Sequence, residues 1–82
     1  MIEKIFEVKN KLGLHARPAA KFVQVTTKFK SRIRVFKEDQ EVDGKSIMGL
    51  MTLAAECGSN IKVIIEGDDE IEMLDKIAEI VE

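Results

Sequence analysis

One histidine, one arginine and one proline lie within four residues of each other, as His15, Arg17 and Pro18. They are the only histidine and the only proline among the 82 residues. A neutral imidazole is a nucleophile near neutral pH, because its reference pKa is about 6.5. The planar fork of an arginine side chain matches the oxygens of a phosphate group. These residue types indicate a site at which His15 takes up a phosphoryl group beside Arg17.

The proline predicts where a helix begins. Proline lacks a backbone N–H and has a fixed φ near the helical value, so Pro18 belongs in the first turn. A helix starting at Ala16 or Arg17 and ending near Lys28 or Phe29 makes His15 its N-cap. Its apolar stripe follows helical spacing, with the members Ala19, Phe22, Val23, Thr26 and Phe29.

Histidine is not among the preferred N-cap residues, which suggests another role for the His15 ring. The start of a helix offers unpaired N–H groups, including that of Ala16, and a partial positive charge that attracts anions. A phosphoryl group on His15 would rest against these donors and Arg17. The alternative is that His15 is an ordinary surface histidine before an ordinary helix.

A second helix is predicted between Ser46, a favoured N-cap residue, and Gly58, a favoured residue after a helix end. It is apolar nearly all round, with one stripe of Leu50, Leu53, Ala54 and Cys57 and another of Met48, Met51, Thr52 and Ala55. The second stripe has two interpretations. It packs in the core, or it is a docking patch, for which flexible methionines are well suited.

Alternating apolar residues predict strands over Ile2–Val8, Arg32–Phe36, Glu41–Asp43 and Asn60–Glu66. A last helix is predicted after Gly67, with Asp69 and Glu72 as a capping box. Its expected buried stripe is Ile71, Leu74, Ile77, Ala78 and Val81. The order βαββαβα predicts an α+β fold in which the helices cover one face of an antiparallel sheet, an open-faced two-layer sandwich.

Length and composition predict a single domain over residues 1–82, of a globular, cytoplasmic protein. No apolar run reaches the length of a membrane span, and the N-terminus lacks a signal-peptide pattern. The lone Cys57 cannot form an internal disulfide and is expected to be buried or half-buried. We expect no metal, because no His/Cys spacing is present, and no cofactor.

Charge is distributed unevenly along the chain. Residues 1–37 carry ten Lys or Arg against two acidic residues, whereas residues 38–82 carry three against thirteen. A basic half containing His15 would attract anionic ligands and acidic protein partners, although the charges could also serve only to solvate outer faces. Direct nucleic-acid binding is not expected, because tyrosine and tryptophan are absent and no aromatic stacking motif is present.

Two motifs resemble the signatures of the HPr family, the histidine-containing phosphocarriers of the bacterial phosphoenolpyruvate:sugar phosphotransferase system. They are Gly13-Leu14-His15-Ala16-Arg17-Pro18-Ala19-Ala20 and Lys45-Ser46-Ile47-Met48-Gly49-Leu50-Met51. The resemblance covers the whole chain and implies the sheet order 1-4-2-3, with three helices on one face. Ala54 stands where many members have glycine.

The resemblance also implies roles for residues. His15 would accept a phosphoryl group from enzyme I and pass it to an enzyme IIA domain, with Arg17 stabilising the phosphohistidine. Ser46 would be a regulatory site for an HPr kinase/phosphorylase, and its phosphorylated form a corepressor for a catabolite control protein. The docking surface would comprise Ile47, Met48, Met51 and Thr52, with Ala20 and Gln24 at its margin.

The expected protein is therefore a carrier substrate with no turnover of its own, and a monomer that visits several partners. One alternative is a mainly regulatory HPr-like protein, acting in catabolite repression or a nitrogen-type phosphorelay. Another is a plain ligand-binding or RNA-binding α+β domain.

Overall fold

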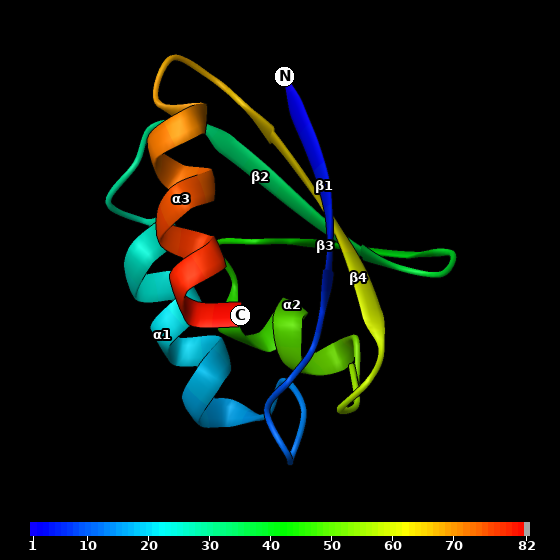
Figure 1. Ribbon diagram of the computed structural model, residues 1–82. Helices are drawn as coiled ribbons and strands as arrows, with labels where there is room; N and C mark the ends of the chain where they lie inside the picture. The colour runs from blue at the N-terminus through cyan, green and yellow to red at the C-terminus, as the bar shows by residue number, and fades with distance from the viewer. Residues whose placement is uncertain (82) are drawn as a thin grey trace.

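The computed structural model describes residues 1–81, which form four strands and three helices in the predicted order. The elements are β1 (Ile2–Glu7), α1 (Ala16–Thr26), β2 (Arg32–Lys37), β3 (Gln40–Asp43), α2 (Ile47–Thr52), β4 (Asn60–Glu66) and α3 (Glu70–Val81). The strands form one antiparallel sheet in the order β1-β4-β2-β3. This is the predicted open-faced sandwich, with α1 and α3 side by side (Figure 1).

The core lies between the sheet and the helices. Alternate residues of the two central strands point into it, including Val35 on β2 and Val63 opposite it on β4. The helices contribute Phe22, Leu50 and Ile77, which are fully buried. Burial of one such side chain contributes about 1.5–3 kcal/mol, so this shared core holds the helices to the sheet.

The first helix begins at Ala16, as predicted, and ends at Thr26, two or three residues earlier than predicted. Its buried side is the predicted apolar stripe, with Val23 and Phe29 partly buried against the core. Beyond the helix end, the Lys45 ammonium donates to the Phe29 carbonyl at 2.8 Å. This contact joins the end of α1 to the segment that leads into α2.

The prediction that the second helix reaches Gly58 is wrong, because α2 ends at Thr52. Ala54 has a left-handed φ of 51°, which no helix continues. The carbonyls left free there take side-chain donors from the β2–β3 hairpin: Gln40 donates to Thr52 at 3.2 Å and Lys37 to Ala54 at 3.3 Å. Side chains from distant strands therefore satisfy carbonyls at this helix end, and these contacts could not be inferred from the sequence of the helix itself.

The segment between α2 and β4 is irregular, and its apolar residues differ in burial. Leu53 and Ala55 are buried, whereas Ala54 and Cys57 are exposed. The expectation that Cys57 is buried or half-buried is wrong for this reason, because the helical stripe that placed it in the core does not exist.

The predicted buried stripe of α3 is confirmed except at Ile71, and Met73 joins it. Met73, Ile77 and Val81 are buried, and Leu74 and Ala78 are partly buried against the core. Ile71, which was predicted to be buried, is 66 % exposed. Met73 lies four residues before Ile77 on the same side of the helix, and this side packs against β1, β4 and α1.

The predicted capping box of α3 is wrong. The Asp69 carboxylate instead accepts hydrogen bonds from the backbone N–H of Lys30 at 2.9 Å, the backbone N–H of Ser31 at 3.0 Å and the Ser31 hydroxyl. Glu70, rather than Glu72, accepts from the Gly67 N–H at 3.2 Å. Asp69 thus joins the start of α3 to the loop between α1 and β2.

Candidate functional site

The backbone of His15 caps α1 while its side chain stays free. Its φ of −83° and ψ of −171° are those of an extended N-cap residue, and its carbonyl accepts from the Ala19 N–H at 3.0 Å. The imidazole is exposed and makes no capping hydrogen bond within residues 1–81. The predicted N-cap position is confirmed, and the ring is available to react with a group from outside.

The first turn of α1 keeps two backbone donors unpaired. The amides of Ala16 and Arg17 have no hydrogen-bond acceptor among the described residues, and Pro18 has no N–H to offer. The turn carries no acidic residue that would occupy this end of the helix. These donors and the positive end of the helix dipole favour an anion beside the His15 ring.

The loop that leads to His15 is fixed at three points. The Gly13 N–H donates to the Asn10 carbonyl at 2.9 Å, closing a tight turn in which Gly13 has a φ of +73°. The Leu14 side chain is buried, and its N–H donates to the Ala55 carbonyl at 2.9 Å. A Cβ on Gly13 would collide with that same carbonyl. His15 therefore leaves the core from a well-defined backbone position.

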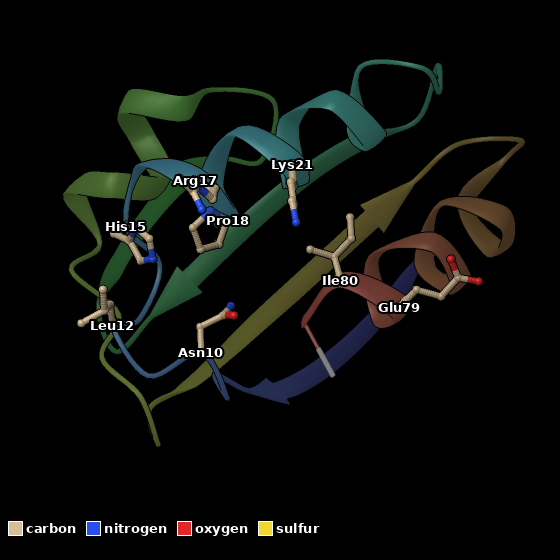
Figure 2. Close-up of a pocket in the computed structure, with 8 residues that line it drawn as sticks. All are labelled: Asn10, Leu12, His15, Arg17, Pro18, Lys21, Glu79 and Ile80. Atoms are coloured by element: carbon tan, nitrogen blue, oxygen red, sulfur yellow. The ribbon is translucent and has the colours of Figure 1, made fainter.

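A surface hollow of about 490 Å³ lies beside His15. It is lined by Asn10, Leu12, His15, Arg17, Pro18 and Lys21, and by Glu79 and Ile80 of α3. Figure 2 shows His15, Arg17 and Pro18 together at the start of α1, with Lys21 one turn further along. The Glu79 carboxylate turns away from them (Figure 2). It lies 4.0 Å from the Lys76 ammonium. Two cationic side chains thus line a hollow with room for an anionic group.

Ser46 is the N-cap of α2, as predicted. Its hydroxyl oxygen accepts from the Gly49 N–H at 3.0 Å, and its carbonyl accepts from the Leu50 N–H at 3.0 Å. The residue is half-buried at the N-terminal end of the helix. Negative charge added there would meet the positive end of α2 rather than its negative end.

The apolar surface of α2 consists of Ile47, Met48 and Met51, which we call the docking patch. Their exposed fractions are 40 %, 73 % and 41 %. Thr52 and Gln24 are also exposed, and Ala20 is half-buried. The core interpretation of this stripe is therefore wrong for the methionines, while Ala55 is buried.

A second hollow, of about 290 Å³, connects His15 to the docking patch. Its lining comprises Leu12, Leu14, His15, Met51, Ala54, Ala55 and Glu56. Leu12 is 79 % exposed and lines both hollows. Sequence analysis did not select it, because an apolar residue in a loop next to glycine is a weak signal. The same holds for Lys21 and Asn10, whose proximity to His15 depends on the fold.

No group of three His, Cys, Asp or Glu side chains suited to a metal ion occurs within residues 1–81. None of the helices in this described part has the length and apolar character needed to cross a bilayer.

Comparison with known proteins gives consistent matches over nearly the whole chain. A family model described as the PTS HPr component phosphorylation site matches residues 2–82. The chain is 50 % identical over 82 residues to the HPr-like protein Crh of Halalkalibacterium halodurans, covering all of this chain and 98 % of that protein. It is 44 % identical over 77 residues to the phosphocarrier protein HPr of Treponema pallidum, covering 94 % and 88 %.

Solved structures agree with these matches. HPr-C-His from Thermoanaerobacter tengcongensis superposes with a TM-score of 0.94 at 48 % identity, covering 99 % of this chain and 91 % of that one. Crh of Bacillus subtilis, described as a catabolite repression protein in a domain-swapped dimer, gives 0.78 at 46 % identity, covering 99 % and 93 %. Family model, relatives and fold agree, and the chain belongs to the HPr family of phosphocarrier proteins.

Proposed function

We propose that this protein carries a phosphoryl group on His15, accepting it from enzyme I and passing it to an enzyme IIA domain. The observation that supports this most directly is the exposed His15 imidazole, which caps α1 through its backbone and leaves its ring unbonded within residues 1–81. A ring nitrogen would attack the phosphorus of a phosphorylated enzyme I while the bond to the donor group breaks. The reverse process, with enzyme IIA as acceptor, returns His15 to its free state.

The residues around His15 would stabilise the phosphorylated form without hydrolysing it. The Ala16 amide and the Arg17 guanidinium would hold the phosphoryl oxygens, and Pro18 would set the first turn of the helix. The side chains that line the hollow beside His15 include two cations, Arg17 and Lys21, which would hold a phosphoryl group by charge. In this proposal the protein is a substrate that is loaded and unloaded by other enzymes and has no turnover of its own.

Partner enzymes would dock on the surface next to this site. The docking patch of Ile47, Met48 and Met51 lies on α2, which packs against α1, and Ala20, Gln24 and Thr52 would lie at the margin. Arg17 and Lys21 line the hollow beside His15 and would favour an acidic rim on the partner. We propose that enzyme I and enzyme IIA use this surface in turn.

Ser46 supports a second, regulatory role. Its hydroxyl lies at the N-terminus of α2 beside the docking patch, so phosphorylation there would add two negative charges next to the surface that partners use. We propose an HPr kinase/phosphorylase and a catabolite control protein as the partners of this role. Similarity to Crh, which is described as a catabolite repression protein in Bacillus subtilis, favours this candidate.

Labelling separates these functions. The protein is incubated with enzyme I and phosphoenolpyruvate, and an acid-labile phosphoryl adduct is expected on the wild type and absent from His15→Ala. An absent adduct on the wild type, together with ATP-dependent labelling of Ser46 by the kinase, would favour a purely regulatory protein. Labelling at neither residue would leave a ligand-binding or RNA-binding domain.

We also propose that the carrier is a monomer in the cytoplasm, because a protein that presents one surface to several partners in turn gains from keeping it uncovered. Light scattering during gel filtration tests the oligomeric state. A mass of about twice the 9.2 kDa of the chain would contradict this part of the proposal and would parallel the swapped dimer described for Crh of Bacillus subtilis.

A further inference from the structure

The methionines of this chain fall into three clearly different environments. Met48 is 73 % exposed and Met51 is 41 % exposed, and both belong to the docking patch. Met1 is 75 % exposed, but it lies at the start of β1, where its ammonium group pairs with Glu70. Met73 has no exposed surface and packs in the core. Exposed thioethers therefore occur on the surface beside His15. Met1 provides an exposed methionine away from this surface for comparison, and Met73 provides a buried one.

Exposed thioethers react with peroxides by oxygen-atom transfer. The sulfur gives up two electrons and forms a bond to one peroxide oxygen, while the peroxide O–O bond breaks and the other oxygen leaves as water. The product, methionine sulfoxide, is polar and is reversed by methionine sulfoxide reductases. Exposure of the sulfur controls which methionines react, so Met48 and Met51 are accessible and Met73 is protected.

Oxidation at these positions would change the docking patch without unfolding the protein. In this region, the side chains that pack in the core are Leu50 and Leu53, which are 0 % and 1 % exposed. Met48 and Met51 are exposed, so their oxidised side chains would remain in contact with water in the free protein. In a complex, each sulfoxide oxygen would be buried against apolar partner surface, which is unfavourable unless it finds a donor.

Met51 is also close to the proposed phosphoryl acceptor, since Met51 and His15 line the same hollow of about 290 Å³. A sulfoxide on Met51 would place a partially negative oxygen beside the position at which a dianionic phosphoryl group arrives. Oxidation would therefore act on docking through both methionines and on the phosphoryl group through Met51.

We propose that Met48 and Met51 form a reversible oxidation site for hydrogen peroxide, and that their oxidation weakens the docking of phosphoryl donors and acceptors. The modification itself depends only on the exposure and chemistry of the two side chains. Its effect on docking rests on the proposed function.

The site is tested by mapping oxidation in the full chain. Cys57→Ser is used as the background, because the Cys57 thiol is exposed and would also react. After treatment with hydrogen peroxide, peptide mass spectrometry is expected to find one added oxygen at Met48 and Met51, with Met1 as the exposed reference and Met73 unmodified. Modification of Met73 at the same rate as Met48 and Met51 would overturn the assignment of these two residues as an oxidation site.

The effect on docking is tested by phosphoryl transfer from enzyme I before and after oxidation. Oxidation is expected to raise the KM for this protein by about tenfold, the size of one poorly satisfied buried polar group, and methionine sulfoxide reductase is expected to restore it. In Met48→Leu/Met51→Leu, the KM after peroxide is expected to equal that variant's own KM before peroxide. Met73→Leu keeps both patch methionines and is expected to remain sensitive.

The outcomes separate this inference from the proposed function. If the untreated protein accepts a phosphoryl group and the oxidised protein accepts it with the same KM, the effect on docking is wrong and the carrier function stands. If the double leucine variant loses transfer as the wild type does, another residue is responsible and the assignment is wrong. If the untreated protein accepts no phosphoryl group, the carrier function and the effect on docking both fail, while the mass map still decides whether the two methionines are an oxidation site.

Discussion

The backbone N–H of Leu14 donates to the carbonyl of Ala55 at 2.9 Å, which ties the loop before His15 to the segment after α2. The two residues are far apart in the sequence, and both side chains are buried. The contact joins the proposed phosphoryl acceptor and the docking patch into one surface. Gly13 lies against the same carbonyl, so a substitution at Gly13 tests how strictly the position of His15 is maintained.

Gly13→Ala is expected to lower the free energy of unfolding by about 3 kcal/mol, because its φ of +73° strains any other residue and its Cβ would collide with the Ala55 carbonyl. Displacement of the loop is also expected to slow phosphoryl transfer to His15. Denaturant unfolding and the labelling rate measure the two effects.

Gly58→Ala is the matched control for this substitution. Gly58 has a φ of +91°, but an added Cβ would meet no atom of the described residues within 4 Å. Only the strain of the left-handed conformation remains, which corresponds to about 1 kcal/mol. Equal losses for the two variants would show that the Ala55 carbonyl does not restrict this loop.

Ala54→Gly is expected to raise the free energy of unfolding by about 0.5–1 kcal/mol. Ala54 has a φ of 51°, a conformation that glycine adopts without the steric cost of a Cβ. Thermal unfolding measures the gain as a higher Tm. Ala78→Gly, within α3, is the control and is expected to destabilise by about 1 kcal/mol, since glycine is unfavourable inside a helix. A lower Tm for Ala54→Gly would contradict the argument.

Sequence analysis predicted well those features that depend on residues close together in the chain. The strand Asn60–Glu66 alternates regularly and was predicted with its observed bounds. His15 and Ser46 were recognised as N-caps because a proline in the first turn and a serine before a helix act within a few residues. These local signals identify His15 and Ser46 as N-cap residues without knowledge of the fold.

Features that depend on distant contacts were not predictable in the same way. At the end of α2, carbonyls accept hydrogen bonds from Lys37 and Gln40 of the β2–β3 hairpin, and Asp69 accepts from Ser31. Ile71 and Met73 are both apolar residues in the first turns of α3, and only the packed structure shows that Met73 is buried and Ile71 exposed. The hollow beside His15 is likewise formed by residues from three separate segments. These are Leu12 of the loop before His15, Lys21 of α1 and Ile80 of α3, which come together only when the chain folds.

Two substitutions of Ser46 separate its capping role from its regulatory role. Ser46→Ala removes the acceptor for the Gly49 N–H and is expected to lower the free energy of unfolding by about 1 kcal/mol, or the Tm by about 4–8 °C. Ser46→Asp keeps an acceptor and adds a negative charge at the start of α2, so its Tm is expected to equal that of the wild type.

The rate of phosphoryl transfer from enzyme I is expected to rank the two variants the other way round from their stability. Ser46→Asp is expected to slow it, because the added charge lies beside the docking patch and repels an acidic partner, whereas Ser46→Ala adds no charge. Thermal unfolding and labelling rates on the same preparations give the comparison. A large loss of stability in Ser46→Asp would contradict this account of the N-cap.

The Asp69 carboxylate predicts how stability depends on pH. Hydrogen bonds from the Ser31 hydroxyl and from the backbone of Lys30 and Ser31 favour its charged form and hold its pKa below the ordinary value of 3.8. The unfolded chain therefore binds a proton more readily than the folded protein. This contribution to stability is complete well above pH 4 and is lost as the pH falls through the lowered pKa.

Asp69→Asn is expected to lower the free energy of unfolding at pH 7, since the amide has one acceptor oxygen and no charge. The difference from the wild type is expected to shrink as the pH falls from 5 toward 2, because protonation removes the same interaction from Asp69. Urea unfolding at a series of pH values measures it. Asp68→Asn, at an exposed neighbour, is the control and should keep the acid-dependent loss seen in the wild type. A difference between Asp69→Asn and the wild type that stays constant with pH would mean that the charge of Asp69 does not hold α3 to the loop at Ser31.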